Sequence, residues 1–153
     1  ESFPDTQLIF TMPNADPENK ILRDMIEAFV DRRDNANSFI SLGQKKYLSC
    51  IAQVDAVVGN SSSGLAEAPS FKKATINIGK RQTGRILADS VITCNAIKLD
   101  IIQALNKIYT PEFQKQLKIS KNPYGDGGAV SKIIKILPTL DISSALKKSF
   151  IDK

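Results

Sequence analysis

The sequence predicts an α/β protein with a Rossmann-like, doubly wound parallel sheet, and three observations carry this prediction. Short apolar runs of four to six residues alternate with longer segments whose apolar side chains recur every three or four positions. Glycine, proline or small polar residues follow most of the short runs, as expected where strands turn into helices. The 153 residues, of which 42% are hydrophobic, suffice for one domain with a core of its own.

The first strand is predicted at residues 7–12, where the apolar run QLIFTM ends at Pro13. Asp16 is expected to cap the helix that follows, with Pro17 at the first helical position, where its missing N–H does no harm. That helix has a broad apolar stripe at spacing four, so we expect one face to pack on a sheet. The stripe consists of Ile21, Leu22, Met25, Ile26, Phe29 and Val30.

The remaining elements follow the same alternation. Further strands are predicted at residues 38–42, 56–59, 74–78 and 90–94. Helices are predicted at 44–53, with Tyr47, Leu48 and Ile51 facing inward, and at 65–68, 97–108, 111–119, 130–137 and 142–150. The chain has no G-x-G-x-x-G motif, so we do not expect a nicotinamide or flavin dinucleotide.

The stretch from Asp55 to Arg85 is the most informative part of the chain. A short strand at 56–59 runs into the hydroxyl-rich turn 60–64 and then into a helix-forming segment. A helix that starts there would direct its free N–H groups and its positive dipole end at the strand terminus, which favours a bound phosphate. The alternative interpretation is a serine- and glycine-rich turn with an ordinary N-cap.

Other known phosphate and nucleophile motifs do not fit this turn. Leu65 and Ala66 stand where a Walker A loop needs Lys and Ser or Thr, so the sequence does not predict an ATPase. Ser63 occupies the second glycine position of a nucleophile elbow. The chain also contains no histidine, which excludes a Ser-His-Asp triad.

Parallel sheets bind ligands at the carboxyl ends of their strands, and the loops there carry the parts of a nucleotide-diphosphate pocket. Tyr47 is a candidate to stack on a base, the Ser61–Gly64 turn to hold phosphates, and Glu67 to accept bonds from sugar hydroxyls. Arg81 or Arg85 would neutralise the phosphate charge. The alternatives are a core tyrosine, a surface carboxylate near a helix start, and solvated loop arginines.

Composition limits the other functions that we expect. The net charge of +5 and the pI of about 9.2 suit an anionic ligand, but the lysines are spread along the chain, so we do not expect nucleic-acid binding. No membrane helix or signal peptide is predicted. Cys50 and Cys94 lack CxxC spacing and are interpreted as buried thiols of a cytoplasmic protein, without a metal site. Because the chain opens with Glu1, we expect it to be a piece of a longer protein.

Three motifs together resemble a known family. These are GNSSSGLAEAPSFKKATINIGKRQTGR at 59–85, DSV at 89–91 and NPYGDG at 122–127. They resemble the C-terminal half of the UDP-N-acetylglucosamine 2-epimerases, most of all the hydrolysing type that supplies N-acetylmannosamine for sialic acid synthesis. Non-hydrolysing relatives have Gly-Gly after the first serine and the loop Arg-Asp-Thr-Thr-Glu-Arg. Here Ser62 and Ser63 follow Ser61, and Lys80, Arg81 and Gln82 occupy the loop.

The resemblance implies a GT-B-like enzyme, in which two Rossmann-like domains face each other across a cleft and the C-terminal one holds most of the UDP. Residues 1–141 would form that UDP-binding domain, and 142–153 a helical tail that returns towards the first domain. The positions that match the family's UDP site are Ser61, Ser62 and Ser63 for the diphosphate, Arg81 facing the phosphates, Glu67 for the ribose, and Tyr47 and the Leu42 backbone for the uracil.

The chemistry implied by the resemblance is elimination of UDP to a glycal, followed by addition of water to release the free 2-epimeric sugar, with no metal or cofactor. The family's acid and base carboxylates and a functional histidine lie in the N-terminal domain, so no catalytic residue is expected in this chain. We expect it to bind UDP weakly and to turn nothing over alone. The full-length enzyme would be a homo-oligomer acting on UDP-N-acetylglucosamine or on a 2,4-diacetamido trideoxy analogue.

Two other functions fit the same sequence features. The chain could be the donor-binding half of a GT-B glycosyltransferase, which predicts acceptor-dependent transfer with the configuration at C2 retained. It could also be a non-catalytic module that binds nucleotide sugars, which predicts tight binding by the chain alone.

Overall fold

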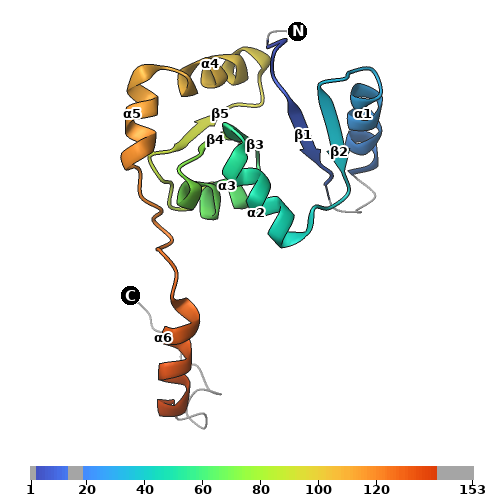
Figure 1. Cartoon of the computed structure of the whole chain (residues 1–153). Coiled ribbons are helices and arrows are strands. Elements are labelled where there is room, and N and C mark those ends of the chain that lie inside the picture. The colour runs from blue at the N-terminus through green and yellow to red at the C-terminus, as the bar shows by residue number, and fades with distance from the viewer. Residues whose placement is uncertain (1–2, 14–18, 141–153) are drawn as a thin grey trace. The chain divides into compact units, whose positions relative to one another are not determined.

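The computed structural model describes residues 3–13 and 19–140 (Figure 1). The chain forms two compact units, Glu1–Pro123 and Tyr124–Lys153, each of which is described here by itself. The predicted helix at 142–150 lies outside the described residues, as do the proposed cap Asp16 and Pro17. The domain boundary expected after residue 141 therefore stays a prediction.

All strand pairs of the first unit are parallel, which confirms the predicted α/β class with parallel sheets. The strands are β1 (Leu8–Thr11), β2 (Ala36–Phe39), β3 (Ala56–Gly59), β4 (Ala74–Ile78) and β5 (Val91–Cys94). They form a two-stranded sheet, β1-β2, and a three-stranded sheet in the order β3-β4-β5. The parallel ladder is thus divided between two sheets.

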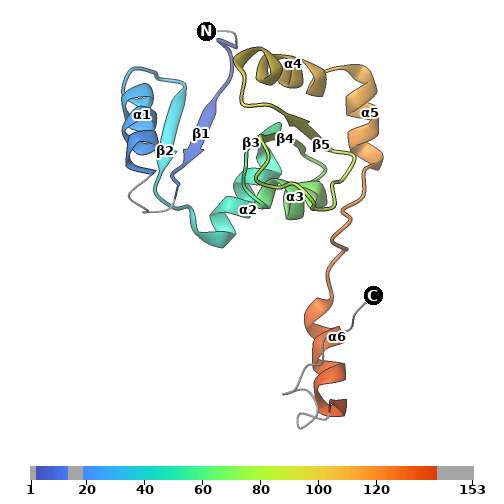
Figure 2. The same ribbon diagram turned by 180° about the vertical axis from the view of Figure 1, so that it is seen from behind.

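Helices follow β1, β2, β3 and β5, whereas the loop 79–90 joins β4 to β5 without a helix. They are α1 (Lys20–Val30), α2 (Gly43–Gln53), α3 (Ser63–Ala66), the 3₁₀ turn η2 (Ala68–Phe71), α4 (Lys98–Ile108) and α5 (Pro111–Ile119). In both views, α4 and α3 lie on opposite sides of the three-stranded sheet (Figures 1 and 2). The β3-β4-β5 sheet is therefore covered on both faces, as the doubly wound pattern predicts.

The core of the first unit is built around β4, the middle strand of its sheet. Four of the five residues of β4 are buried, because helices cover the strand from both sides. The buried hydrophobic cluster of this core consists of Ala74, Ile76, Ala104, Ile108, Phe113 and Leu117. Burial of one such isoleucine, leucine or phenylalanine side chain contributes roughly 1.5–3 kcal/mol. The core therefore fixes β4 and α4, and with them the strand ends that carry the candidate site.

Two predicted elements differ from the structure. The strand expected at 38–42 is β2, at 36–39, because the ladder pairs Leu8 with Ala36 and Thr11 with Phe39, so that β2 ends where β1 ends. The helix expected at 65–68 starts earlier and stops at Ala66. Pro69 explains this end, since it has no N–H to donate to the preceding turn and disfavours a helical Ala68.

Burial of the outer elements is also lower than the sequence predicts. Val58 in β3 is 48% exposed, and β1 alternates between half-buried and exposed residues, because both are edge strands. The apolar stripe of α1 is used only in part. Phe29 packs edge-on against Phe10 with ring centroids 5.8 Å apart, whereas Met25 is 64% exposed.

The second unit contains α6 (Ala129–Ile136) and the 3₁₀ turn η3 (Leu137–Thr139). The helix lies within one residue of the predicted segment 130–137, and Pro138 sits in the 3₁₀ turn that ends it. Gly128 precedes the helix with a left-handed backbone at φ 76°, a conformation that glycine adopts without strain. Within residues 3–13 and 19–140, no helix has the length and apolar content needed to cross a membrane.

Candidate functional site

The turn between β3 and α3 holds the predicted serines at the surface. Ser61 and Ser62 are exposed, and the Ser61 hydroxyl oxygen accepts a bond of 3.3 Å from the Ser63 N–H. The Ser62 carbonyl oxygen accepts from the N–H groups of Leu65 and Ala66, which closes the first helical turn. Among the described residues, the N–H groups of Ser61 and Ser62 donate to no acceptor. The turn therefore presents two open backbone donors next to two exposed hydroxyls.

Gly64 brings the start of α3 directly against the sheet. The buried Thr75 hydroxyl of β4 donates to the Gly64 carbonyl oxygen at 2.7 Å. A Cβ atom at position 64 would lie only 2.6 Å from the Thr75 Cγ2 atom, closer than real Cβ contacts. The close approach of α3 and β4 thus requires a glycine at this position. The same contact fixes the distance between β4 and the turn Ser61–Gly64, which is called the serine turn below.

Tyr47 reaches the same turn from α2. Its hydroxyl lies 2.7 Å from the Ser63 hydroxyl, and both residues are half-buried. The structure therefore brings together two predicted site residues that are 16 positions apart in the sequence. The Ser63 hydroxyl is already hydrogen-bonded to Tyr47, whereas Ser61 and Ser62 are exposed to solvent.

The loop after β4 is tied to the serine turn through Asn60. The Gln82 amide nitrogen donates to the Asn60 carbonyl oxygen at 2.7 Å, and Gln82 is only 5% exposed. The exposed Arg81 guanidinium also reaches the Asn60 side chain, at 3.4 Å, which is long for a hydrogen bond. Sequence reasoning predicted Arg81 but missed Asn60 and Gln82, because nothing local marks a glutamine that bonds a residue 22 positions earlier.

Two predicted residues stand apart from this group. Glu67 is exposed at the end of α3, and Leu42 is half-buried at the start of α2. In the part of the chain that the structure describes, no hydrogen bond joins the Glu67 carboxylate to the serine turn, and the Leu42 side chain is apolar and can form none. Their roles at a ligand remain predictions, as do those of Tyr47, Ser61, Ser62, Ser63 and Arg81.

The side chain of Asn122, in the segment after α5, supports α3 and the 3₁₀ turn η2. Its side-chain amide donates to the Ala66 carbonyl oxygen at 2.8 Å and to the Ser70 hydroxyl at 2.7 Å. The Lys72 ammonium group donates to the Ser120 carbonyl oxygen in the same region. The segment 120–122, which precedes the loop with Gly125, Gly127 and Gly128, thus supports α3 of the candidate site.

Two described groups outside the serine turn have perturbed pKa values. Burial, and to a smaller extent the Asp100 carboxylate, raise the pKa of the Cys94 thiol. Burial, and to a smaller extent the Asp55 carboxylate, raise the pKa of the Tyr109 hydroxyl. Neither group is among the predicted ligand-binding residues, and both shifts keep the neutral form at higher pH.

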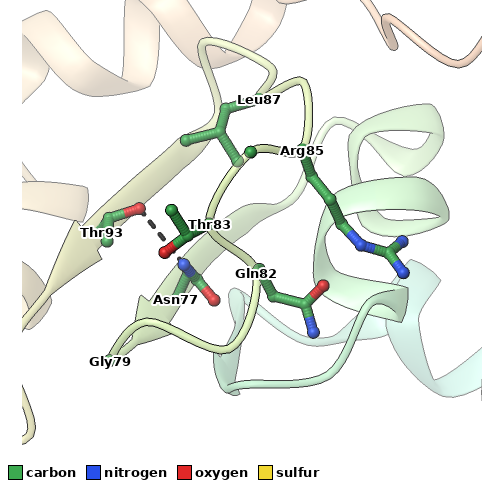
Figure 3. A pocket seen from close by; sticks show the side chains of 8 residues that line it. Asn77, Gly79, Gln82, Thr83, Arg85, Leu87 and Thr93 are labelled. Atoms are coloured by element: carbon green, nitrogen blue, oxygen red, sulfur yellow. Dashed lines mark hydrogen bonds between the residues drawn. The ribbon is translucent and has the colours of Figure 1, made fainter.

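A cavity of about 280 Å³ lies beneath the loop after β4, at the carboxyl ends of β4 and β5 (Figure 3). It is lined by Asn77, Gly79, Gln82, Thr83, Gly84, Arg85, Leu87 and Thr93. The Gln82 side chain lines this cavity and also bonds Asn60, so the cavity and the serine turn share a residue. The sequence did not predict this cavity.

Taken with the loop charges, the serine turn is suited to an anion. Open N–H groups, hydroxyls and a guanidinium all donate hydrogen bonds, and a phosphate group accepts them with each of its oxygens. Lys80, Arg81 and Arg85 are exposed on the adjacent loop, which makes this end of the sheet positively charged. The arrangement can bind and stabilise a phosphate or diphosphate.

Comparisons with known proteins point to one family. The family model described as UDP-N-acetylglucosamine 2-epimerase matches residues 1–138. The chain is 38% identical over 154 aligned residues to GDP/UDP-N,N'-diacetylbacillosamine 2-epimerase (hydrolyzing) of Campylobacter jejuni. It is 33% identical over 144 residues to UDP-N,N'-diacetylbacillosamine 2-epimerase (hydrolyzing) of Legionella pneumophila.

A solved structure shares the fold. The crystal structure of a UDP-N-acetylglucosamine 2-epimerase homologue from Listeria monocytogenes superposes with a TM-score of 0.74 at 20% identity, covering 97% of this chain and 39% of that one. The alignments cover 99% and 92% of this chain but only 40% and 36% of the Campylobacter and Legionella proteins. The chain therefore spans about two fifths of the length of these curated relatives.

Proposed function

Because this chain belongs to the UDP-N-acetylglucosamine 2-epimerase family, we propose that it is the UDP-binding, C-terminal part of a hydrolysing 2-epimerase. The observation that carries the proposal is the serine turn, where the N–H groups of Ser61 and Ser62 are open and Arg81 reaches the adjacent Asn60. We assign residues 1–141 to the UDP-binding domain and 142–153 to a tail that contacts the rest of the enzyme.

Each part of UDP is assigned a place in this site. The diphosphate is held by Ser61 and Ser62, with the Ser63 hydroxyl behind them, and Arg81 balances its charge. Glu67 accepts hydrogen bonds from the ribose hydroxyls, because a carboxylate provides several acceptor lone pairs. The Tyr47 ring and the backbone near Leu42 lie beside the uracil.

The proposed reaction uses these groups to stabilise a leaving group. A base in the N-terminal part of the enzyme removes the proton from C2 of the sugar, and the C1–O bond breaks to leave a glycal and UDP. Water then adds to the glycal and releases the free 2-epimeric sugar. As the C1–O bond breaks, negative charge grows on the diphosphate, and each donor held in place for it contributes about 2–4 kcal/mol to lowering the barrier.

The names of the two relatives also support a proposal about the substrate class. We propose a nucleotide sugar with an acetamido group at C2. The Campylobacter and Legionella relatives are named for N,N'-diacetylbacillosamine nucleotides, so we expect the 2,4-diacetamido sugar to be the better substrate. Assay of the full-length protein with both sugars tests this order, and NMR identifies the released sugar. Release of the free 2-epimer with UDP supports the proposal, whereas transfer to an acceptor with retained configuration at C2 contradicts it.

Substitutions in the site give the first prediction. Glu67→Ala and Arg81→Ala should each weaken UDP binding by about tenfold, because each removes one charged hydrogen-bonding partner. Isothermal titration calorimetry of the chain with UDP measures the effect. Glu112→Ala, which removes an exposed carboxylate at the start of α5, is the matched control and should leave the affinity unchanged. Unchanged affinity in both site variants would contradict the proposed site.

A further inference from the structure

One side chain of the loop after β4 is buried although its neighbours are solvated. Within the described loop 80–87, Gln82 alone is buried, at 5% exposure, whereas Arg81 and Thr83 beside it are exposed. The Gln82 Nε2 atom donates to the backbone carbonyl oxygen of Asn60 at 2.7 Å, across 22 positions of the sequence. This hydrogen bond ties the loop that carries Arg81 to the residue that precedes the serine turn.

The stability of the loop does not explain why residue 82 is an amide. Among the described residues, the Gln82 Oε1 atom is buried and has no hydrogen-bond partner. A half-satisfied buried amide costs free energy, so an apolar side chain of the same size would anchor the loop better. Asn60 is exposed, so water could bond its carbonyl oxygen in place of Gln82. The amide at position 82 is therefore better explained by the group that its N–H positions.

That group is the peptide unit that joins Asn60 to Ser61. The carbonyl of residue 60 and the N–H of residue 61 belong to one planar trans unit and point in opposite directions. Because Gln82 holds the carbonyl oxygen, the Ser61 N–H is directed away from Gln82. This N–H donates to no acceptor among the described residues. A hydrogen bond at the carbonyl also polarises the peptide unit and makes its N–H a stronger donor.

The loop on either side of Gln82 is ordered by bonds of its own. The Thr83 N–H and the Thr83 hydroxyl both donate to the Lys80 carbonyl oxygen, at 3.0 and 2.7 Å. Arg81 lies within this turn, and its guanidinium is 3.4 Å from the Asn60 Oδ1 atom. The anchored Gln82 therefore fixes Arg81 relative to the Ser61 N–H, and the proposed function places both at the diphosphate.

We propose that Gln82 is a positioning residue for the diphosphate, which acts through the Asn60–Ser61 peptide unit to aim the Ser61 N–H at a phosphoryl oxygen. The inference rests on the proposed function and deepens it, because Gln82 aligns a donor without touching the nucleotide. Tyr47 and Glu67 are assigned to the uracil and the ribose, and neither is hydrogen-bonded to Gln82 in the part of the chain that the structure describes. Loss of the Gln82 donor should therefore affect only ligands that carry phosphates.

The signal of one backbone amide tests this inference. In two-dimensional NMR of the 153-residue chain, saturation with UDP should move the Ser61 amide proton downfield, because it gains a hydrogen bond to a phosphoryl oxygen. Uridine has no phosphate and should leave that proton in place. Gln82→Met keeps the length of the side chain but has no donor, so the shift induced by UDP should be largely lost. A role of Gln82 in stability alone would not change this response to UDP.

Affinities of the same variants provide a second measurement. Gln82→Met should weaken UDP by about five- to tenfold and uridine by less than about twofold. Gln82→Glu keeps a polar side chain that cannot donate when ionised, and should cause the same selective loss if Gln82→Met does not fold. Gln103→Met makes the control exchange at an exposed position of α4 and should change neither affinity. Circular dichroism confirms the fold of each variant.

The outcomes separate the inference from the proposed function. If the unmodified chain does not bind UDP, the proposed function fails and the inference fails with it. If UDP binds but leaves the Ser61 amide proton unshifted, the inference alone is overturned, and this result needs no variant. The inference is also overturned if Gln82→Met binds UDP as tightly as Gln103→Met does. Equal weakening of UDP and uridine would overturn it too, because Gln82 would then support the fold in general.

Discussion

Hydroxyl groups of the candidate site differ in what their neighbours leave available. The Ser63 hydroxyl is held at 2.7 Å by Tyr47, whereas Ser61 and Ser62 are exposed. A hydrogen bond between two half-buried hydroxyls stabilises the folded chain only modestly, but it fixes the position of both groups. The Tyr47 ring is therefore held beside the serine turn by its own hydroxyl. Two substitutions of Tyr47 can therefore distinguish the proposed stacking of its ring on the uracil base from the hydrogen bond of its hydroxyl to Ser63.

Tyr47→Phe keeps the ring and removes the hydroxyl. We expect it to lower the free energy of unfolding by about 1 kcal/mol, since one hydrogen bond is lost, and to keep UDP affinity within about twofold. Tyr47→Ala also removes the ring and should weaken UDP by about tenfold, because stacking on a base is worth about 1–3 kcal/mol. Urea denaturation and calorimetry measure the two effects. Equal UDP affinity of Tyr47→Ala and the unmodified chain would show that the ring does not contact the base.

The ionisation of the Cys94 thiol gives a second prediction for a single residue. Burial, followed by the Asp100 carboxylate, raises the pKa of its thiol, so less thiolate is present at a given pH. In a Cys50→Ser background, alkylation of Cys94 at pH 8 should be slower in the folded chain than in urea. Asp100→Asn should speed it, by less than unfolding does, because burial is the larger cause. Glu112→Gln is the control, and an unchanged rate for Asp100→Asn would contradict the electrostatic contribution.

Among the elements, the contact between α3 and β4 controls the site most directly. The first turn of α3 lies so close to β4 that Gly64 has no room for a side chain, and the Thr75 hydroxyl bonds the Gly64 carbonyl oxygen. This contact sets where the open N–H groups of Ser61 and Ser62 stand relative to the strand end. A shift of α3 away from β4 would move the proposed diphosphate site as a whole.

The contact between α3 and β4 is tested by a pair of substitutions. Gly64→Ala should destabilise the chain by about 1–3 kcal/mol, because the added methyl group would lie 2.6 Å from the Thr75 Cγ2 atom. Thr75→Ser removes that Cγ2 atom and keeps the hydroxyl that bonds the Gly64 carbonyl oxygen. The double variant should therefore recover much of the loss, as measured by thermal unfolding. Strictly additive effects would contradict the steric explanation.

At the scale of the whole molecule, the core and the candidate site lie in one of the two units. The buried cluster extends from Ala74 to Leu117, and the predicted site residues extend from Leu42 to Arg81. All of them belong to the unit Glu1–Pro123. In the other unit, α6 has large apolar side chains that are more than half exposed, among them Val130 at 70%. The unit from Tyr124 onward therefore contributes none of the described residues of the site.

Truncation after Pro123 tests this division of roles. We expect the shortened chain to keep its cooperative unfolding and to bind UDP within about twofold of the full chain, because the core and site residues are retained. Calorimetry with UDP and a thermal melt measure both properties. Loss of UDP binding with the fold intact would mean that residues after Pro123 take part in the site.

The sequence alone determined the features that arise from neighbouring residues. The strand at 74–78 and the helix at 111–119 have the predicted bounds, because both signals are local. The strand alternates apolar with polar residues (ATINI) and has β-branched side chains, and the helix has the Thr110–Pro111 start. The Thr110 hydroxyl accepts a hydrogen bond from the Phe113 N–H, as an N-cap does. The same local logic placed a hydroxyl-rich turn between β3 and α3, and the quoted motifs predicted the family.

Only the tertiary structure decided which distant residues meet. The bonds from Thr75 to Gly64, from Tyr47 to Ser63 and from Gln82 to Asn60 join positions 11, 16 and 22 residues apart. The pairing of β1 with β2 likewise set where β2 ends. Such contacts depend on the order and register of strands and on how closely helices approach them. Local composition carries no information about these distances, so the cavity with Asn77 and Gln82 emerged only from the folded chain.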